Sequence, residues 1–200
     1  MIKKIALILF TKNPELGKVK TRLAKTIGDE NALDIYKKLL HHTKEVALQI
    51  KADKFLFYSN EIQDNDQWEN TVFDKKLQVG DNLGVRMNAA FAEVFALHYD
   101  HVCIIGSDCY ELNATTVQSA FKALENNDFV VGPTYDGGYY LLGMNKPNER
   151  VFEDVAWSTE SVFETTISRI TETKNSAFIL DKLTDIDEEI NLPEIWKIQR

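Results

Sequence analysis

Short apolar runs alternate with longer amphipathic stretches along most of this 200-residue chain. The first run, Ile5–Phe10, is continuous and apolar, which is typical of a strand buried on both faces. Similar runs predict further strands at 54–59, 71–79, 101–106, 128–132, 138–144 and 177–180. Between them, apolar residues recur every three or four positions, as on one face of a helix. The helices predicted in this way run from Asp29 to about residue 50, from Asn82 to about 95, from Asn113 or Thr115 to about 126, and from Ser158 to about 174.

This alternation predicts an α/β sandwich, with helices on both faces of a mostly parallel sheet. In such sheets, ligands bind beyond the carboxyl ends of the strands. We therefore expect the loop after Phe10, the turn at Asp108 and the loop at 133–138 to meet at one edge. No repeat or linker interrupts the pattern, which predicts a single domain over residues 1–200.

Positive charge is concentrated near the N-terminus. Residues 1–25 hold seven lysines and arginines against one acid, whereas the whole chain has a net charge of −8. Pro14 and Gly17 bend the chain there, so that amide groups can point inward beside Lys18, Lys20 and Arg22. A basic loop after a strand predicts a phosphate-binding site, and a solvated lysine-rich turn is the alternative. The acidic remainder argues against nucleic-acid binding.

Carboxylates follow at the same predicted edge. Asp108 comes directly after a buried strand, close to the predicted phosphate loop. A carboxylate beside phosphates needs a cation between them, which predicts Mg²⁺ or Mn²⁺; a helix cap is the alternative. Asp185 and Asp187 alternate near the end of the chain, where they could face that metal or form a solvated acidic turn.

The segment 132–140 is the densest local motif, because Asp136 is followed by Gly137, Gly138 and two tyrosines. The glycines allow close approach of the backbone to a substrate, and the tyrosines could stack on a base or a sugar. A tight turn between two strands explains the same residues. Trp157, just before a predicted helix start, is either a hydrophobic staple or a ligand contact.

Several classes of protein are excluded. The chain has no Walker A motif, no Gly-x-Gly-x-x-Gly after the first strand, no Gly-x-Ser-x-Gly elbow and no metal-ligand spacing of histidines. Its first apolar run is too short to span a membrane and lacks a signal-peptide cleavage site. These features predict a cytoplasmic protein without membrane contacts, in which Cys103 and Cys109 stay reduced.

Five ordered motifs between Ile5 and about Leu192 resemble one family. It is the bacterial glycosyltransferase-like family of the radical-SAM/selenodomain-associated transferase type, within the GT-A nucleotide-diphospho-sugar transferases. The segment 20–23 is also similar to a loop of guanylyltransferases. The motifs are Phe10-Thr-Lys-Asn-Pro with Gly17-Lys-Val-Lys-Thr-Arg-Leu, Gly80-Asp-Asn-Leu-Gly-Val-Arg-Met, Gly106-Ser-Asp-Cys, Gly132-Pro-Thr-Tyr-Asp-Gly-Gly-Tyr-Tyr and Trp157-Ser-Thr.

The resemblance implies a three-layer α/β/α fold and a set of site residues. The implied nucleotide and phosphate contacts are Lys12, Gly17, Lys18, Lys20, Thr21, Arg22, Asn82, Leu83, Gly84 and Arg86. Lys20, Arg22 and Asp136 would be catalytic, and Asp108 and Asp187 would hold the metal. Gly137, Gly138, Tyr139 and Trp157 would form the acceptor side. The chain departs from the family pattern at Tyr110, Glu188 and Asn191, where Pro, Thr and Asp are usual.

The sequence therefore predicts a Mg²⁺- or Mn²⁺-dependent transferase, with a nucleotide sugar as donor and a small molecule as acceptor. One alternative is a nucleotidyltransferase, in which an acceptor attacks an NTP and pyrophosphate leaves. The other is a nucleotide-binding module without catalytic activity.

Overall fold

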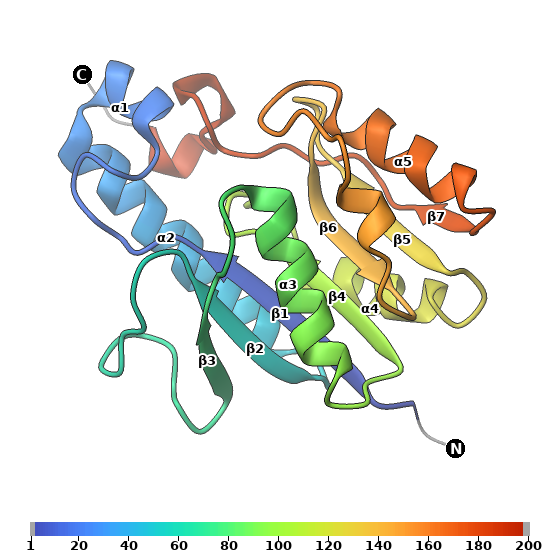
Figure 1. Ribbon diagram of the computed structural model, residues 1–200. Helices are drawn as coiled ribbons and strands as arrows, with labels where there is room; N and C mark the ends of the chain where they lie inside the picture. Colours follow the sequence, from blue (N-terminus) through green and yellow to red (C-terminus); the bar gives the residue numbers. More distant parts are fainter. Residues whose placement is uncertain (1–2, 198–200) are drawn as a thin grey trace.

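The computed structural model describes residues 3–197, which form one seven-stranded sheet with helices on both faces (Figure 1). The strand order is β3-β2-β1-β4-β6-β5-β7. All neighbouring strands are parallel except β6, which runs antiparallel to both β4 and β5. The strands are β1 (Ile5–Thr11), β2 (Asp53–Tyr58), β3 (Phe73–Leu77), β4 (His101–Ile105), β5 (Phe129–Pro133), β6 (Tyr139–Met144) and β7 (Ala177–Ile179).

Two apolar clusters hold the layers together. Helices α2 and α4 pack on one face of the sheet, and α3 and α5 pack on the other, as Figure 1 shows. The helices are α1 (Thr21–Ile27), α2 (Asp29–Leu48), α3 (Leu83–Phe95), α4 (Ala114–Ala123) and α5 (Val162–Glu172), with short 3₁₀ helices η1 (Glu149–Phe152), η2 (Glu189–Asn191) and η3 (Glu194–Trp196). The predicted three-layer α/β/α fold with a mixed, mostly parallel sheet is confirmed.

One predicted helix start is wrong, because two helices meet where a single one was expected. Asp29 is not an N-cap but the first residue of α2, whose N-cap is Gly28. Gly28 also ends the short helix α1, and its φ of 83° is a backbone conformation that favours glycine. Helix α1 buries only Leu23 and Ile27, too few apolar positions to give a helical period in the sequence.

Of the other predicted caps, two are confirmed and one is wrong. Asn82 and Asn113 are N-caps, and each side chain accepts a 3.0 Å hydrogen bond from the backbone N–H three residues on. Ser158 is not a cap: its φ is 66°, and α5 begins four residues later, after Ser161. The intervening residues form a turn at the carboxyl edge of the sheet.

The chain changes direction between β1 and β4. It winds from β1 outward to β2 and β3, and then returns to form β4 on the other side of β1. In open α/β sheets, the crevice where the winding reverses is the usual place for a ligand. Here the crevice lies between the residues that follow Thr11 and those that follow Ile105.

The C-terminal segment crosses back to this crevice after β7. Leu183 donates its N–H to Pro133 O at 3.1 Å and accepts a bond from Tyr135 N at the same distance. Ile186 N then donates to Asp108 O at 2.9 Å. These backbone bonds fix Asp185 and Asp187 beside the turn that follows β4.

Candidate functional site

A cavity with a volume of ≈ 980 Å³ opens at the crevice between β1 and β4. Its walls come from residues 10–12, the loop at 19–22, the start of α3, the turn after β4, the start of β6, segment 157–162 and the C-terminal segment. Most of the site residues predicted from the sequence line it: Lys12, Lys20, Thr21, Arg22, Leu83, Asp108, Asp136, Gly138, Tyr139, Trp157 and Asp187.

Lys20 is enclosed in this cavity, with 4% of its side chain exposed. Its Nζ lies 2.5 Å from Asp108 Oδ1 and 3.3 Å from Asp187 Oδ1. Burial lowers the pKa of Lys20, but the attraction of the two carboxylates outweighs it and raises the pKa above the ordinary value. The ammonium group is therefore held in its charged form between Asp108 and Asp187.

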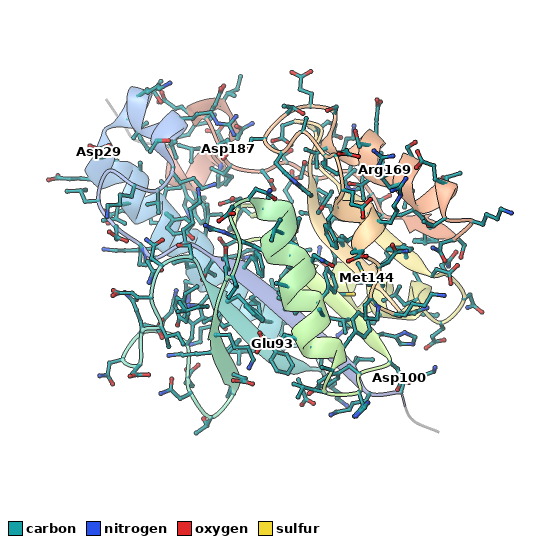
Figure 2. The ribbon with its side chains drawn as sticks, viewed as in Figure 1. Asp29, Glu93, Asp100, Met144, Arg169 and Asp187 are labelled. Carbon is teal, nitrogen blue, oxygen red and sulfur yellow. The ribbon has the colours of Figure 1, made fainter. Side chains whose placement is uncertain are left out.

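Arg22, in the first turn of α1, adds a second cation close to Lys20. Its Nη2 lies 2.6 Å from Asp187 Oδ2, so that Asp187 bridges Lys20 and Arg22. The Arg22 side chain lines the cavity and is 61% exposed. Figure 2 shows Asp187 on the C-terminal segment beside the end of the molecule that carries α1. The basic loop and Asp108 thus lie together, as the sequence predicted.

Asp185 is a third carboxylate of this cluster, for which the sequence left a metal site and a solvated turn as equal alternatives. Its Oδ1 is buried and has no hydrogen-bond partner. Burial, reinforced by the charge of Asp108, raises the pKa of Asp185 to about 8. The sequence held one signal for the shared orientation of Asp185 and Asp187, because an apolar residue, Ile186, stands between them. Ile186 is buried, and in an extended segment its two neighbours point together to the opposite side.

These carboxylates fit a divalent cation in their chemistry, since Mg²⁺ and Mn²⁺ prefer oxygen ligands. The unpartnered Oδ1 of Asp185 is one such oxygen. Among residues 3–197, no three His, Cys, Asp or Glu side chains are already arranged to hold a metal ion. An ion bound here would therefore need phosphate oxygens and water to complete its ligands, which is the common arrangement for Mg²⁺ with nucleotides.

Two buried residues that were not predicted from the sequence fix the basic loop. Asn13 accepts a 3.1 Å bond from Asn60 N at Oδ1 and donates from Nδ2 to Glu61 O at 2.9 Å. The Tyr36 hydroxyl accepts from Lys12 N at 2.8 Å and donates to Lys12 O at 3.0 Å. These bonds hold the start of the loop against β2 and α2, so its position does not depend on a ligand.

The opposite wall of the cavity is apolar. The Trp157 indole packs on Gly84 at the start of α3 so closely that a Cβ there would lie 2.5 Å from the ring. Tyr139 meets Trp157 edge to face at 6.5 Å between ring centroids, and its hydroxyl donates to Met87 S at 3.8 Å. Leu83, 45% exposed, completes this wall.

Six predicted site residues do not line the cavity: Gly17, Lys18, Asn82, Gly84, Arg86 and Gly137. Lys18 is exposed and pairs with Glu15 at 2.5 Å, while Arg86 Nε donates to Gly80 O at 2.8 Å. Gly137 has a φ of 90°, and a Cβ there would lie 2.1 Å from Glu160 O. Arg86 and Gly137 thus have structural partners, and their contacts with a nucleotide or an acceptor stay predictions.

Asp136 faces the cavity from the turn between β5 and β6. Its Oδ1 accepts from Thr134 Oγ1 at 2.5 Å and from Gly138 N at 3.2 Å. These bonds orient the carboxylate and close the turn, as the alternative of a tight turn between two strands predicted. A contact of Asp136 with the acceptor stays a prediction.

The departures from the family pattern have structural explanations. Tyr110 packs between His42 and Trp196, with ring centroids 4.8 and 4.3 Å away. Glu188 and Asn191 form a reciprocal capping box around η2. All three residues therefore secure the C-terminal segment that delivers Asp185 and Asp187.

Comparison with known proteins identifies the family. Residues 42–159 match the profile described as "Uncharacterized protein conserved in bacteria" (DUF2064). The chain belongs to this family. A search of curated proteins finds no match to the DUF2064 chain. The narrower resemblance to the radical-SAM/selenodomain-associated type stays a prediction.

Solved structures share its fold. A provisionally assigned nucleotide-diphospho-sugar transferase from Desulfovibrio desulfuricans G20 is 28% identical, with a TM-score of 0.86 over 94% of this chain and 84% of that one. The inositol-1-phosphate CTP transferase from T. maritima is 12% identical, with a TM-score of 0.57 over 97% and 94%. The 4-diphosphocytidyl-2C-methyl-D-erythritol synthase from Anaerococcus prevotii DSM 20548 is 10% identical, with a TM-score of 0.62 over 94% of each chain.

The DUF2064 chain thus has a fold found in transferases that act on nucleotides. Within the part that the structure describes, no helix combines the length and the apolar character needed to cross a membrane.

Proposed function

We propose that the DUF2064 chain is a metal-dependent transferase that uses a nucleotide sugar as donor. The observation that carries the proposal is the Lys20 ammonium group, enclosed between Asp108 and Asp187 at the crevice where the sheet reverses its winding. Cations and carboxylates are gathered there in a cavity of ≈ 980 Å³, large enough for a nucleotide and an acceptor. The matching fold of the Desulfovibrio protein supports the same class of enzyme.

In this proposal, Asp108 and Asp187 would hold Mg²⁺ or Mn²⁺, which would supply positive charge next to the donor phosphates. Lys20 and Arg22 then act as fixed donors towards the phosphate oxygens on which negative charge develops as the sugar bond breaks. Such preorganised charge often contributes more to catalysis than any other effect, about 3 kcal/mol for a well-placed donor. Asp136, held by Thr134 and Gly138, orients the acceptor hydroxyl.

Product analysis tests the reaction. The purified protein is incubated with Mg²⁺, a panel of nucleotide sugars or NTPs, and small-molecule acceptors. We expect a nucleoside diphosphate to be released only when an acceptor is present. Release of pyrophosphate from an NTP would instead establish a nucleotidyltransferase.

Calorimetry separates an enzyme from a passive nucleotide-binding module. We expect nucleotide binding to require Mg²⁺ and to weaken about tenfold in Asp108→Ala, because the phosphates then lose their shared cation. Asp100→Ala is the matched control, because Asp100 lies near the opposite end of β4 and pairs with Lys3. Binding that ignores both Mg²⁺ and Asp108→Ala would contradict the proposal.

A further inference from the structure

The charges that line the cavity are unevenly distributed. Among residues 3–197, its cationic side chains are Lys12, Lys20 and Arg22, all from one segment. Its acids are Asp108, Asp136, Glu160, Asp185 and Asp187. Two of the three cations are already paired, Lys20 with two carboxylates and Arg22 with one. The cations of the cavity therefore lie on one wall, where they can bind one anionic group of a ligand. Within the described part of the chain, no cation lines the remaining walls to bind a second anionic group.

The wall on the α3 side has no positive charge. Leu83, Met87, Tyr139 and Trp157 form it, and the charged residues that line the cavity from the neighbouring turns are the acids Asp136 and Glu160. A phosphate placed against this wall would lose its water without gaining a partner, and it would face like charges. The arrangement is unfavourable for a phosphorylated acceptor.

Neutral hydroxyl groups border the same wall. The Thr159 hydroxyl donates to Ala156 O at 2.7 Å and lies 2.8 Å from Ser161 Oγ, and Ser158 lines the cavity beside them. An edge-to-face aromatic pair next to hydroxyl groups suits a ring with one apolar face and polar edges, such as a sugar or a substituted phenyl ring.

From this juxtaposition we infer that the acceptor of the DUF2064 chain is an uncharged hydroxyl compound with an apolar face, which packs on Trp157 and Tyr139. The inference rests on the proposed transferase function and narrows its acceptor class. It separates this chain from transferases whose acceptor carries a phosphate. The donor supplies the only phosphates, and Lys12, Lys20 and Arg22 are sufficient to receive them together with a divalent cation.

Matched probes test the inference. The protein is first loaded with Mg²⁺ and whichever of ADP, CDP, GDP and UDP raises its Tm most. Calorimetry then compares phenyl β-glucoside, phenyl β-galactoside and benzyl alcohol, each with its own phosphate ester. We expect at least one neutral probe to bind about tenfold more tightly than its ester. Equal or tighter binding of the esters, or no binding of any probe, would overturn the inference.

A charge placed on the apolar wall should reduce this preference. Leu83→Lys puts a cation on the cavity wall at a half-exposed position, and we expect it to improve binding of the phosphate esters about fivefold. Leu97→Lys is the matched control, because Leu97 is equally exposed at 45% and lies beyond the other end of α3. An identical response of the two variants would contradict the placement of the acceptor.

Trp157→Phe keeps an aromatic ring on Gly84 and should weaken binding of the neutral probes with little change in nucleotide affinity.

The transferase function and the acceptor class can fail separately. Absence of Mg²⁺-dependent nucleotide binding would refute the transferase function. Nucleotide binding combined with a preference for phosphorylated probes would refute only the acceptor class.

Discussion

Two enclosed lysines of this protein have opposite surroundings. Lys75 Nζ lies 2.9 Å from Asp66 Oδ1 and donates to Gln63 O, while Asp66 also accepts from Tyr58 Oη and Trp68 N. One cation thus meets one carboxylate, and every oxygen of that carboxylate is bonded. Lys20 meets two carboxylates directly and a third, Asp185, whose Oδ1 has no partner.

The difference separates a structural ion pair from a binding site. The pair around Lys75 is complete, so that nothing further is needed to satisfy it. The cluster around Lys20 keeps an unsatisfied buried oxygen, Oδ1 of Asp185, which is costly to bury unless a ligand or a cation uses it. Substitutions in the two clusters should therefore affect different properties.

The largest effect on folding is expected at the complete pair. Lys75→Met leaves Asp66 buried without its cation and should lower the free energy of unfolding by about 3 kcal/mol. Urea denaturation measures this, and calorimetry of the folded variant should give an unchanged nucleotide Kd. A stability within error of the parent protein would show that this pair is not structural.

Lys20→Met should show the reverse pattern. Loss of a charge-assisted contact with phosphate should weaken nucleotide binding by about 2 kcal/mol. The stability should change less than in Lys75→Met, because Asp108 is half-exposed and water can solvate it. The two variants, measured by calorimetry and urea denaturation, test the comparison directly, and equal losses of stability would refute it.

A separate, pH-dependent effect on stability is expected from Asp185. Its pKa is about 8 in the folded protein against an ordinary value of 3.8, so the native state holds a proton that the unfolded chain releases. Stability of the metal-free protein should therefore fall as the pH rises from about 4 to about 8. Asp185→Asn should flatten this part of the curve in urea denaturation with EDTA. Parallel curves for the two proteins would show that Asp185 is ionised throughout.

The smallest effect is expected at Lys18, two residues before Lys20. Its ammonium group is exposed and pairs with Glu15 outside the cavity. Lys18→Ala should change the nucleotide Kd by less than about twofold, in contrast to Lys20→Met. A tenfold loss of nucleotide affinity would show that Lys18 belongs to the phosphate site that the sequence predicted.

The sequence was sufficient for the strands, because buried parallel strands are continuous apolar runs such as Ile5–Phe10 and 101–106. It was also sufficient for the edge where the site lies, since the carboxyl ends of these strands meet there. The end of α1 at Gly28 and the start of α5 after Ser161 could not be predicted from the pattern of apolar residues. Ser158 and Ser161 are equally good caps locally, and the contact of Gly137 with Glu160 becomes visible only in three dimensions.

Within the site, the pattern of charges predicted that Lys20, Arg22 and Asp108 belong together. The burial of Asp185 could not be predicted, because it depends on backbone bonds from Pro133, Tyr135 and Asp108 to a segment distant in sequence. The separate surroundings of Lys18 and Lys20 also depend on backbone geometry, since of these two only Lys20 has a left-handed conformation, which turns its side chain inward.

That left-handed conformation, with φ 49° and ψ 41°, has an evolutionary consequence. A lysine pays about 1 kcal/mol for such a backbone, and glycine would adopt it freely. In a laboratory evolution experiment that selects only for survival of heating, the relief of this strain should offset part of the loss of the ion pairs, so replacement of Lys20 by glycine should be tolerated. Retention of lysine at this position would then report selection for the ligand, not for the fold.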